Sequence, residues 1–248
     1  MRAAIGRGAW PPLLLASAAG WLALLGAGQR LSLSGLCATS GENGGGWDWR
    51  ALDLALGTDP SGLLLATALG WLLMLAAMMP PLIAQPVAYL WTRSLARRRW
   101  RAIAGFTAAY AAVWLAAGIA LVALAAAIRA AADAAPLPPL VCGFLLALLW
   151  QMAPAKQACL NRCHRLPALS TFGLAADLDC LRYGVAAGLW CVGACWAWML
   201  VPLLADAAQL LLMAVIAALL AAERQAPARP PRWHLVSFRG ASHSASKT

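Results

Sequence analysis

The stretch GLWCVGACWAWML, residues 188–200, has no charged side chain and lies inside an apolar run that extends over 184–204. About 20 apolar residues in a helix are enough to cross the hydrocarbon core of a bilayer. The stretch also places Cys191, Cys195 and Met199 at intervals of four, and residues at this spacing share one face of a helix. It therefore predicts a membrane-spanning helix with a row of sulfur atoms along one side.

The composition of the whole chain agrees with a membrane protein. Of its 248 residues, 62% are hydrophobic and 11% are charged, and the mean hydropathy is +0.71. Soluble domains have about 25% charged residues, so this chain lies far from that class. We predict an all-α, polytopic transmembrane helical bundle. Its six expected spans are about 11–28, 62–80, 102–128, 138–155, 184–204 and 207–222.

This pattern divides the chain into three segments. Residues 1–61 hold the first span and a Gly-rich outer loop, and residues 62–224 form the membrane domain that carries the sulfur-rich stretches. Residues 225–248 are a basic tail that we expect to be disordered. Two alternatives stay open: the first span is a cleaved secretory signal, or the last two spans form a re-entrant hairpin.

The distribution of charge predicts an orientation. Sixteen of the 19 Lys and Arg residues lie at the two ends of the chain and in the loops after the second and fourth spans. Loops on the cytoplasmic side of a membrane are enriched in Lys and Arg, so both termini are predicted to be cytoplasmic. The same bias explains the net charge of +10, which therefore does not indicate a nucleic-acid partner.

Seven cysteines give the most informative pattern. Four of them form two pairs at the same spacing, Cys159 with Cys163 and Cys191 with Cys195, and His164 directly follows the first pair. A separation of four brings the Cβ atoms of a pair to ~5–6 Å on one helix face. Two such pairs on consecutive spans are expected to converge on one ion. Two further cysteines fall on the outer side, where an oxidising compartment would join them in a disulfide: Cys37 and Cys142.

Methionine adds a second kind of soft ligand. The stretch WLLMLAAMMPP ends the second expected span and holds Met74 and Met78 four residues apart, and Met199 continues the line of Cys191 and Cys195. Thiolates and thioethers select Cu(I) over hard ions, and the same spans offer no carboxylate for Mg²⁺, Ca²⁺ or Mn²⁺. Zn²⁺ held by four Cys is the alternative. The opposing interpretation is packing, because free Cys and Met also fill apolar space.

Four stretches together carry a resemblance to known proteins: Trp71–Pro80, Phe106–Trp114, Gln151–Pro167 and Gly188–Met199. They resemble a bacterial family of predicted metal-binding integral membrane proteins, which includes a membrane copper chaperone of polyphenol oxidases. The resemblance covers about residues 62–224, and an acidic–basic pair, Glu223-Arg224, closes the last helix as the family pattern expects. Two positions depart from that pattern, since Ala194 replaces the first Cys of a frequent doublet and 206–209 lacks a Met.

The resemblance implies a Cu(I) chaperone, rather than an enzyme, that lies in a bacterial inner membrane and supplies copper to a partner copper oxidase. Two other classes remain: a transporter or permease subunit whose cysteines only pack, and a redox protein whose Cys pairs cycle between dithiol and disulfide. In our metal-ligand hypothesis, the buried ligands are Cys191 and Cys195. The entry or exit ligands are Cys159 and Cys163, with His164 as an auxiliary ligand. The weak thioether ligands are Met74, Met78 and Met199.

Overall fold

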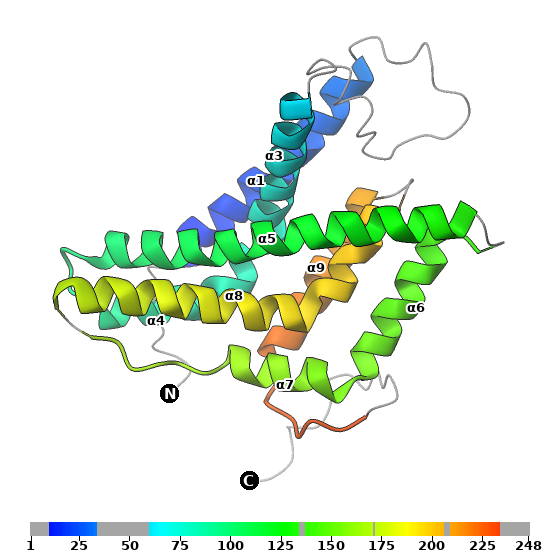
Figure 1. Ribbon diagram of the computed structural model, residues 1–248. Coiled ribbons are helices and arrows are strands. Elements are labelled where there is room, and N and C mark those ends of the chain that lie inside the picture. Colours follow the sequence, from blue (N-terminus) through cyan, green and yellow to red (C-terminus); the bar gives the residue numbers. More distant parts are fainter. Residues whose placement is uncertain (1–9, 34–59, 134–136, 171, 206–208, 234–248) are drawn as a thin grey trace, which may run out of the picture.

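The computed structural model describes residues 10–33, 60–133, 137–170, 172–205 and 209–233. Within these ranges the chain forms eight helices and no strand, which confirms the all-α prediction (Figure 1). The helices are α1 (Trp10–Leu33), α3 (Pro60–Met78), α4 (Pro80–Arg93), α5 (Arg99–Asp133), α6 (Pro139–Met152), α7 (Pro154–Cys163), α8 (Gly173–Leu204) and α9 (Gln209–Gln225).

Helices α5 and α8 run side by side as a parallel pair at the centre of the molecule (Figure 1). Glycine permits their close approach, because a Cβ atom at Gly184 would collide with the carbonyl oxygen of Phe106. At one end Arg98 pairs with Asp177 across 2.5 Å, and near the other end Arg129 donates to the carbonyl of Leu203 across 3.0 Å. The pair therefore stays in contact along its length and supplies the two walls of the site.

The expectation of six uninterrupted spans is not confirmed. Of the described helices, α5 and α8 are long and apolar enough to cross a membrane, and two bent pairs raise the number to four if each counts as one span. The bends measure 69° between α3 and α4 and 70° between α6 and α7. In both pairs the second helix begins with a proline, which lacks the N–H that would continue the preceding helix.

The bend between α3 and α4 is stabilised by α1. Pro81 has no N–H to donate to the carbonyl of Ala77, four residues earlier, so that acceptor is left without its helical partner. The hydroxyl of Ser17 in α1 donates to this carbonyl across 2.6 Å. Gly20 lets the helices approach, since a Cβ there would come within 2.7 Å of the Ala77 nitrogen. This arrangement fixes Met79, the residue at the bend.

The bend between α6 and α7 turns α7 back beneath α8, and a buried polar network holds it there. Lys156 in α7 is 3% exposed, and its Nζ lies 2.7 Å from the Glu223 carboxylate of α9. Gln151 in α6 hydrogen-bonds both of these groups, and it also accepts a hydrogen bond of 2.7 Å from Trp198 of α8. Four helices therefore meet at one ion pair, which sets the position of Cys163 at the end of α7.

Some sequence predictions lie outside the described residues. These include the Gly-rich loop and Cys37, so the disulfide with Cys142 stays a prediction. The turn at 206–208 and most of the basic tail, 234–248, also lie outside the described residues.

Candidate metal centre

The two cysteines of α8 form a buried thiol pair. Cys191 and Cys195 are each 2% exposed, and their Sγ atoms are 3.7 Å apart. The Cys195 thiol also donates to the carbonyl of Cys191 across 2.7 Å, one helical turn earlier. Both sulfur atoms thus face the same side of α8, as their spacing predicts.

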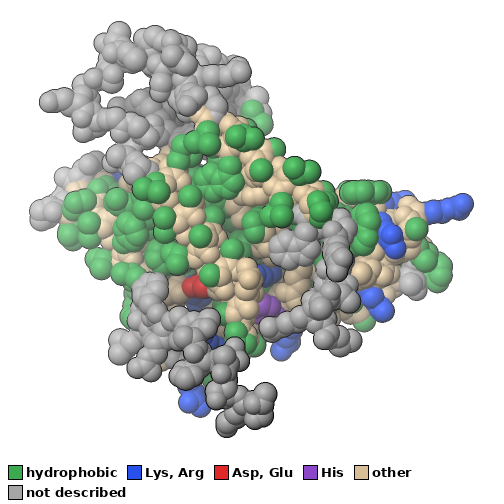
Figure 2. Space-filling view, turned by 180° about the vertical axis from the view of Figure 1, so that it is seen from behind, with side chains coloured by type: hydrophobic (Ala, Val, Ile, Leu, Met, Phe, Trp, Pro, Cys, Tyr) green, Lys and Arg blue, Asp and Glu red, His purple; other side chains and the backbone are tan. Residues whose placement is uncertain are grey.

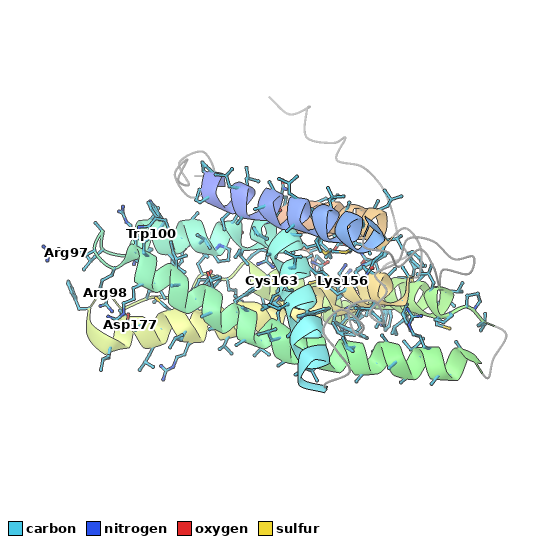
Figure 3. All side chains as sticks on the ribbon, turned by 90° about the horizontal axis from the view of Figure 1, so that it is seen from above. Arg97, Arg98, Trp100, Lys156, Cys163 and Asp177 are labelled. Carbon is cyan, nitrogen blue, oxygen red and sulfur yellow. The ribbon has the colours of Figure 1, made fainter. Side chains whose placement is uncertain are left out.

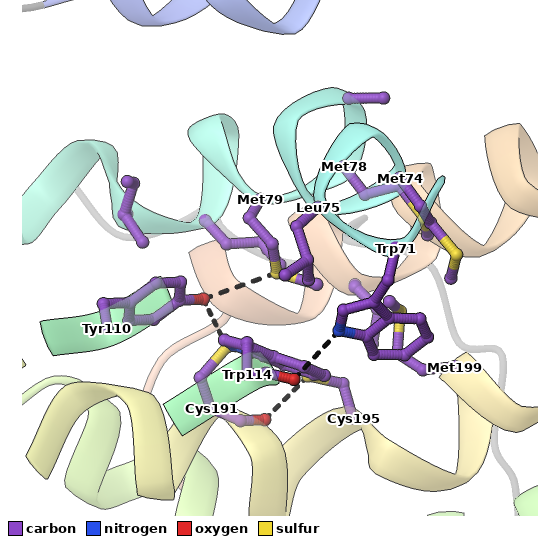
Figure 4. Close-up of a cluster of buried hydrophobic side chains, with 14 of the residues drawn as sticks. Trp71, Met74, Leu75, Met78, Met79, Tyr110, Trp114, Cys191, Cys195 and Met199 are labelled. Atoms are coloured by element: carbon purple, nitrogen blue, oxygen red, sulfur yellow. Dashed lines mark hydrogen bonds between the residues drawn. The ribbon is translucent and has the colours of Figure 1, made fainter. Parts of the chain in front are cut away.

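Two residues from other helices complete this centre, and the sequence-based ligand set did not include them. The Tyr110 hydroxyl in α5 lies 3.1 Å from the Sγ of Cys191 and 3.4 Å from the Sδ of Met79 (Figure 4). We call Met79, Tyr110, Cys191 and Cys195 the sulfur pocket. The sequence held a signal for both additions, because Met79 adjoins the predicted Met78 and Tyr110 lies in the family-like stretch 106–114.

Two tryptophans close the sulfur pocket against water. The Trp71 indole nitrogen donates to the carbonyl of Trp114 across 2.9 Å, and their ring centroids are 6.4 Å apart (Figure 4). Trp114 is completely buried. An ion in this pocket would therefore depend on protein ligands to replace its hydration shell.

The three methionines of the ligand hypothesis are all buried, but their surroundings differ from those of Met79. Met74 lines a small pocket with Trp71 and Met213, and Met199 also lies near the Trp71 ring in Figure 4. Met74, Met78 and Met199 are 5%, 1% and 0% exposed. Of the methionines that the structure describes, Met79 is the one whose sulfur shares a hydrogen-bonding partner with the Cys pair.

The α7 pair does not join the α8 pair at one point. Cys159 packs against Gly193, where a Cβ would come within 2.7 Å of its sulfur. Gly193 lies between Cys191 and Cys195 in the sequence, so it faces the opposite side of α8. Cys163 is buried and interacts electrostatically with Cys191 and Cys195.

His164 caps the C-terminal end of α7 and is half-buried. Among the described residues, no three His, Cys, Asp or Glu side chains are grouped closely enough to hold a metal ion together. The expected convergence of four thiols on one ion is therefore not present in this conformation.

The chemistry of the sulfur pocket fits a soft metal ion. It offers two thiols that become thiolates on binding a metal, together with one thioether that adds no charge. None of its four residues carries a carboxylate, which hard ions require. The fold and site thus define an all-helical protein with a buried thiol and thioether centre between its two longest helices.

Comparison with known proteins identifies the family. The chain belongs to the PpoB2 family of copper chaperones, whose family model matches residues 68–240. This confirms the resemblance drawn from the sequence and identifies copper as the metal that the family handles. No curated protein and no solved structure matches the chain, so the assignment depends on the family model.

Proposed function

We propose that the protein is an integral membrane chaperone that holds Cu(I) in the sulfur pocket and passes it to the apo form of a copper oxidase. The observation that carries this proposal is the pair of buried thiols, 3.7 Å apart, with the Met79 thioether beside them. Family membership supports copper as the cargo. We propose no catalytic reaction for this chain.

The oxidation state of the cargo follows from ligand chemistry. Thiolates and thioethers are soft donors that favour Cu(I), whereas Zn²⁺ is bound most often by four protein ligands. The pocket supplies two thiols and one thioether, which suits the softer ion. A thioether is also a weaker ligand than a thiolate, so its release during transfer is less costly.

The other predicted ligands form the proposed route to and from the pocket. Cys163 lies at the end of α7 on the side that interacts with the α8 thiols, and Cys159 sits one turn earlier. Together with His164 they would receive or deliver the ion. The proposed weak ligands for the ion further along the buried helices, on the Trp71 side, are Met74, Met78 and Met199.

The proposed location is a bacterial inner membrane, with both termini in the cytoplasm. Hydrophobic side chains cover much of the face in Figure 2, and Leu15, Ile119 and Leu211 are 70%, 76% and 66% exposed. Such exposure would be costly in water and is expected against lipid. Arg97 and Arg98 lie beside Trp100 at one end of the α5–α8 pair, an arrangement typical of a membrane–water interface (Figure 3).

The geometry of the α8 pair weighs against a dithiol–disulfide redox function. A disulfide requires Cβ atoms about 3.5–4.5 Å apart. Residues four apart on a continuous helix hold their Cβ atoms at ~5–6 Å. Oxidation of Cys191 with Cys195 would therefore distort α8 at the centre of the fold.

Copper transfer tests the proposal directly. The purified protein is loaded with Cu(I) without oxygen and mixed with an apo copper oxidase, and oxidase activity is followed against time. We expect faster activation than from a Cu(I)–chelator complex buffered to the same free copper concentration. The Cys191→Ser/Cys195→Ser variant serves as the control. Equal activation rates from the protein and from the chelator would contradict a chaperone role.

A further inference from the structure

Arg224, in the last turn of α9, holds a partly buried positive charge beside Cys163. Its Nη2 lies 3.5 Å from the carbonyl oxygen of Cys163, and its Nε is buried without a hydrogen-bond partner in the described part of the chain. Within those same residues no carboxylate lies within ion-pair distance of Arg224. The adjacent Glu223 is instead paired with Lys156, whose Nζ lies 2.7 Å from its carboxylate.

The charge of Arg224 acts on the thiols of the candidate centre. Electrostatic interactions connect its guanidinium with Cys163, Cys191 and Cys195. A cation that is partly withdrawn from water and has no counter-ion is unfavourable, because it loses part of its hydration and gains no compensating charge. The arrangement thus contains one positive charge that the apo pocket leaves uncompensated and that an anionic metal complex would compensate.

We propose that Arg224 is the residue that selects a monovalent cargo ion over a divalent one. This inference rests on the proposed function, because it takes Cys191 and Cys195 as the two thiolate ligands. Binding releases their two thiol protons to solvent, so Cu(I) with two thiolates carries one negative charge. Arg224 balances that charge, and the assembly of ion, thiolates and guanidinium becomes neutral.

A divalent ion gives a different charge balance at the same ligands. Zn²⁺ with two thiolates is neutral, so Arg224 would remain as an uncompensated positive charge in its presence. The Lys156–Glu223 ion pair adds no net charge in either case. Since charge interactions are strong where water is excluded, a single positive charge changes the relative affinities for the two ions.

The test measures Cu(I) and Zn²⁺ affinities of the full-length protein in detergent by competition with chromophoric chelators, anaerobically for Cu(I). Arg224→Gln should lower Cu(I) affinity by on the order of tenfold or more and raise Zn²⁺ affinity. Arg224→Lys keeps the charge and should keep the preference for Cu(I). Arg224→Leu is a second neutral variant for the case in which a polar amide at this partly buried position impairs folding.

Arg182→Gln is the matched control, because it makes the same substitution at an exposed position of α8. It should leave both affinities within about twofold of wild type, as expected for a solvated charge. An unchanged ratio of Cu(I) to Zn²⁺ affinity in the folded neutral variants overturns the role of Arg224. If wild type binds no Cu(I), or Cys195→Ala binds it as wild type does, the proposed function fails as well, so the two failures are distinguishable.

Discussion

The hydroxyl of Tyr110 lies 3.1 Å from the thiol of Cys191, although the two residues are 81 positions apart in the sequence. The same hydroxyl lies 3.4 Å from the Sδ of Met79, which a sharp bend brings in from a third helix. A hydroxyl has one proton, so it donates to one sulfur atom at a time. Tyr110 in α5 thereby connects the soft donor at the α3–α4 bend with the soft donor in α8.

Removing this hydroxyl tests whether it supports the pocket or binds copper. Tyr110→Phe keeps the aromatic ring, which stacks on Phe106 at a centroid distance of 6.1 Å. Loss of the hydrogen bond should lower the free energy of unfolding by ~1 kcal/mol and weaken Cu(I) binding severalfold. Thermal unfolding and chelator competition measure the two effects. A loss of affinity as large as that of Cys195→Ala would instead make the phenolic oxygen a ligand.

The position of Met79 distinguishes it from Met199. Met79→Leu and Met199→Leu both nearly conserve side-chain volume, so each should cost less than ~1.5 kcal/mol of stability. Only the first removes a sulfur that shares a partner with Cys191. We therefore expect Met79→Leu to weaken Cu(I) binding clearly and Met199→Leu only modestly. The opposite order of affinities would place the thioether ligand on α8.

The Lys156–Glu223 pair should stabilise the fold far more than an ion pair near the surface. Glu223→Gln removes the carboxylate that compensates a 3%-exposed lysine, and loss of one partner of a buried pair costs roughly 3 kcal/mol. Asp177→Asn breaks the more exposed Arg98–Asp177 pair and should cost below ~1 kcal/mol. Lys156→Met combined with Glu223→Gln should recover much of the loss. Unfolding in detergent measures all of these variants, and equal costs at the two sites would contradict the interpretation.

The proposed orientation predicts the behaviour of terminal reporters. A reporter that is active only in the cytoplasm should be active when fused after Thr248, because the basic residues concentrate on that side. A second fusion in the segment 34–59, on the predicted outer side, provides the comparison. Activity of a reporter that works only in the periplasm at the C-terminal position would invert the topology.

The relative position of the two thiols on α8 could be predicted from the sequence. The residues that other helices contribute to the site could not. The spacing of Cys191 and Cys195 places both thiols on one face of α8 whatever surrounds the helix, and the structure agrees. Tyr110, Met79 and Arg224 come from other helices, and helical periodicity says nothing about which helices meet. The position of Arg224 depends on α7 and α9, which converge through the Lys156–Glu223 pair.

The number of spans shows a similar limit. Counting apolar residues treats each run as a straight helix, but proline interrupts two of them, at Pro80 and at Pro154. The second expected span ends at Pro80, whereas the structure shows a 69° bend there that continues into a further helix, α4. The bend at Ala153 depends on the polar contacts of Lys156, which no pattern of hydrophobicity contains.

The most direct test of the central claim is a Cu(I) titration of the purified wild-type protein beside Cys191→Ser/Cys195→Ser, under anaerobic conditions against a chromophoric chelator. Serine is close to cysteine in size but lacks the soft sulfur donor, and an intact helical circular-dichroism spectrum would establish that the variant is folded. The account predicts tight binding of Cu(I) by wild type and loss of that binding in the double variant. Equal stoichiometry and affinity in the two proteins would contradict it and return the α8 cysteines to helix packing.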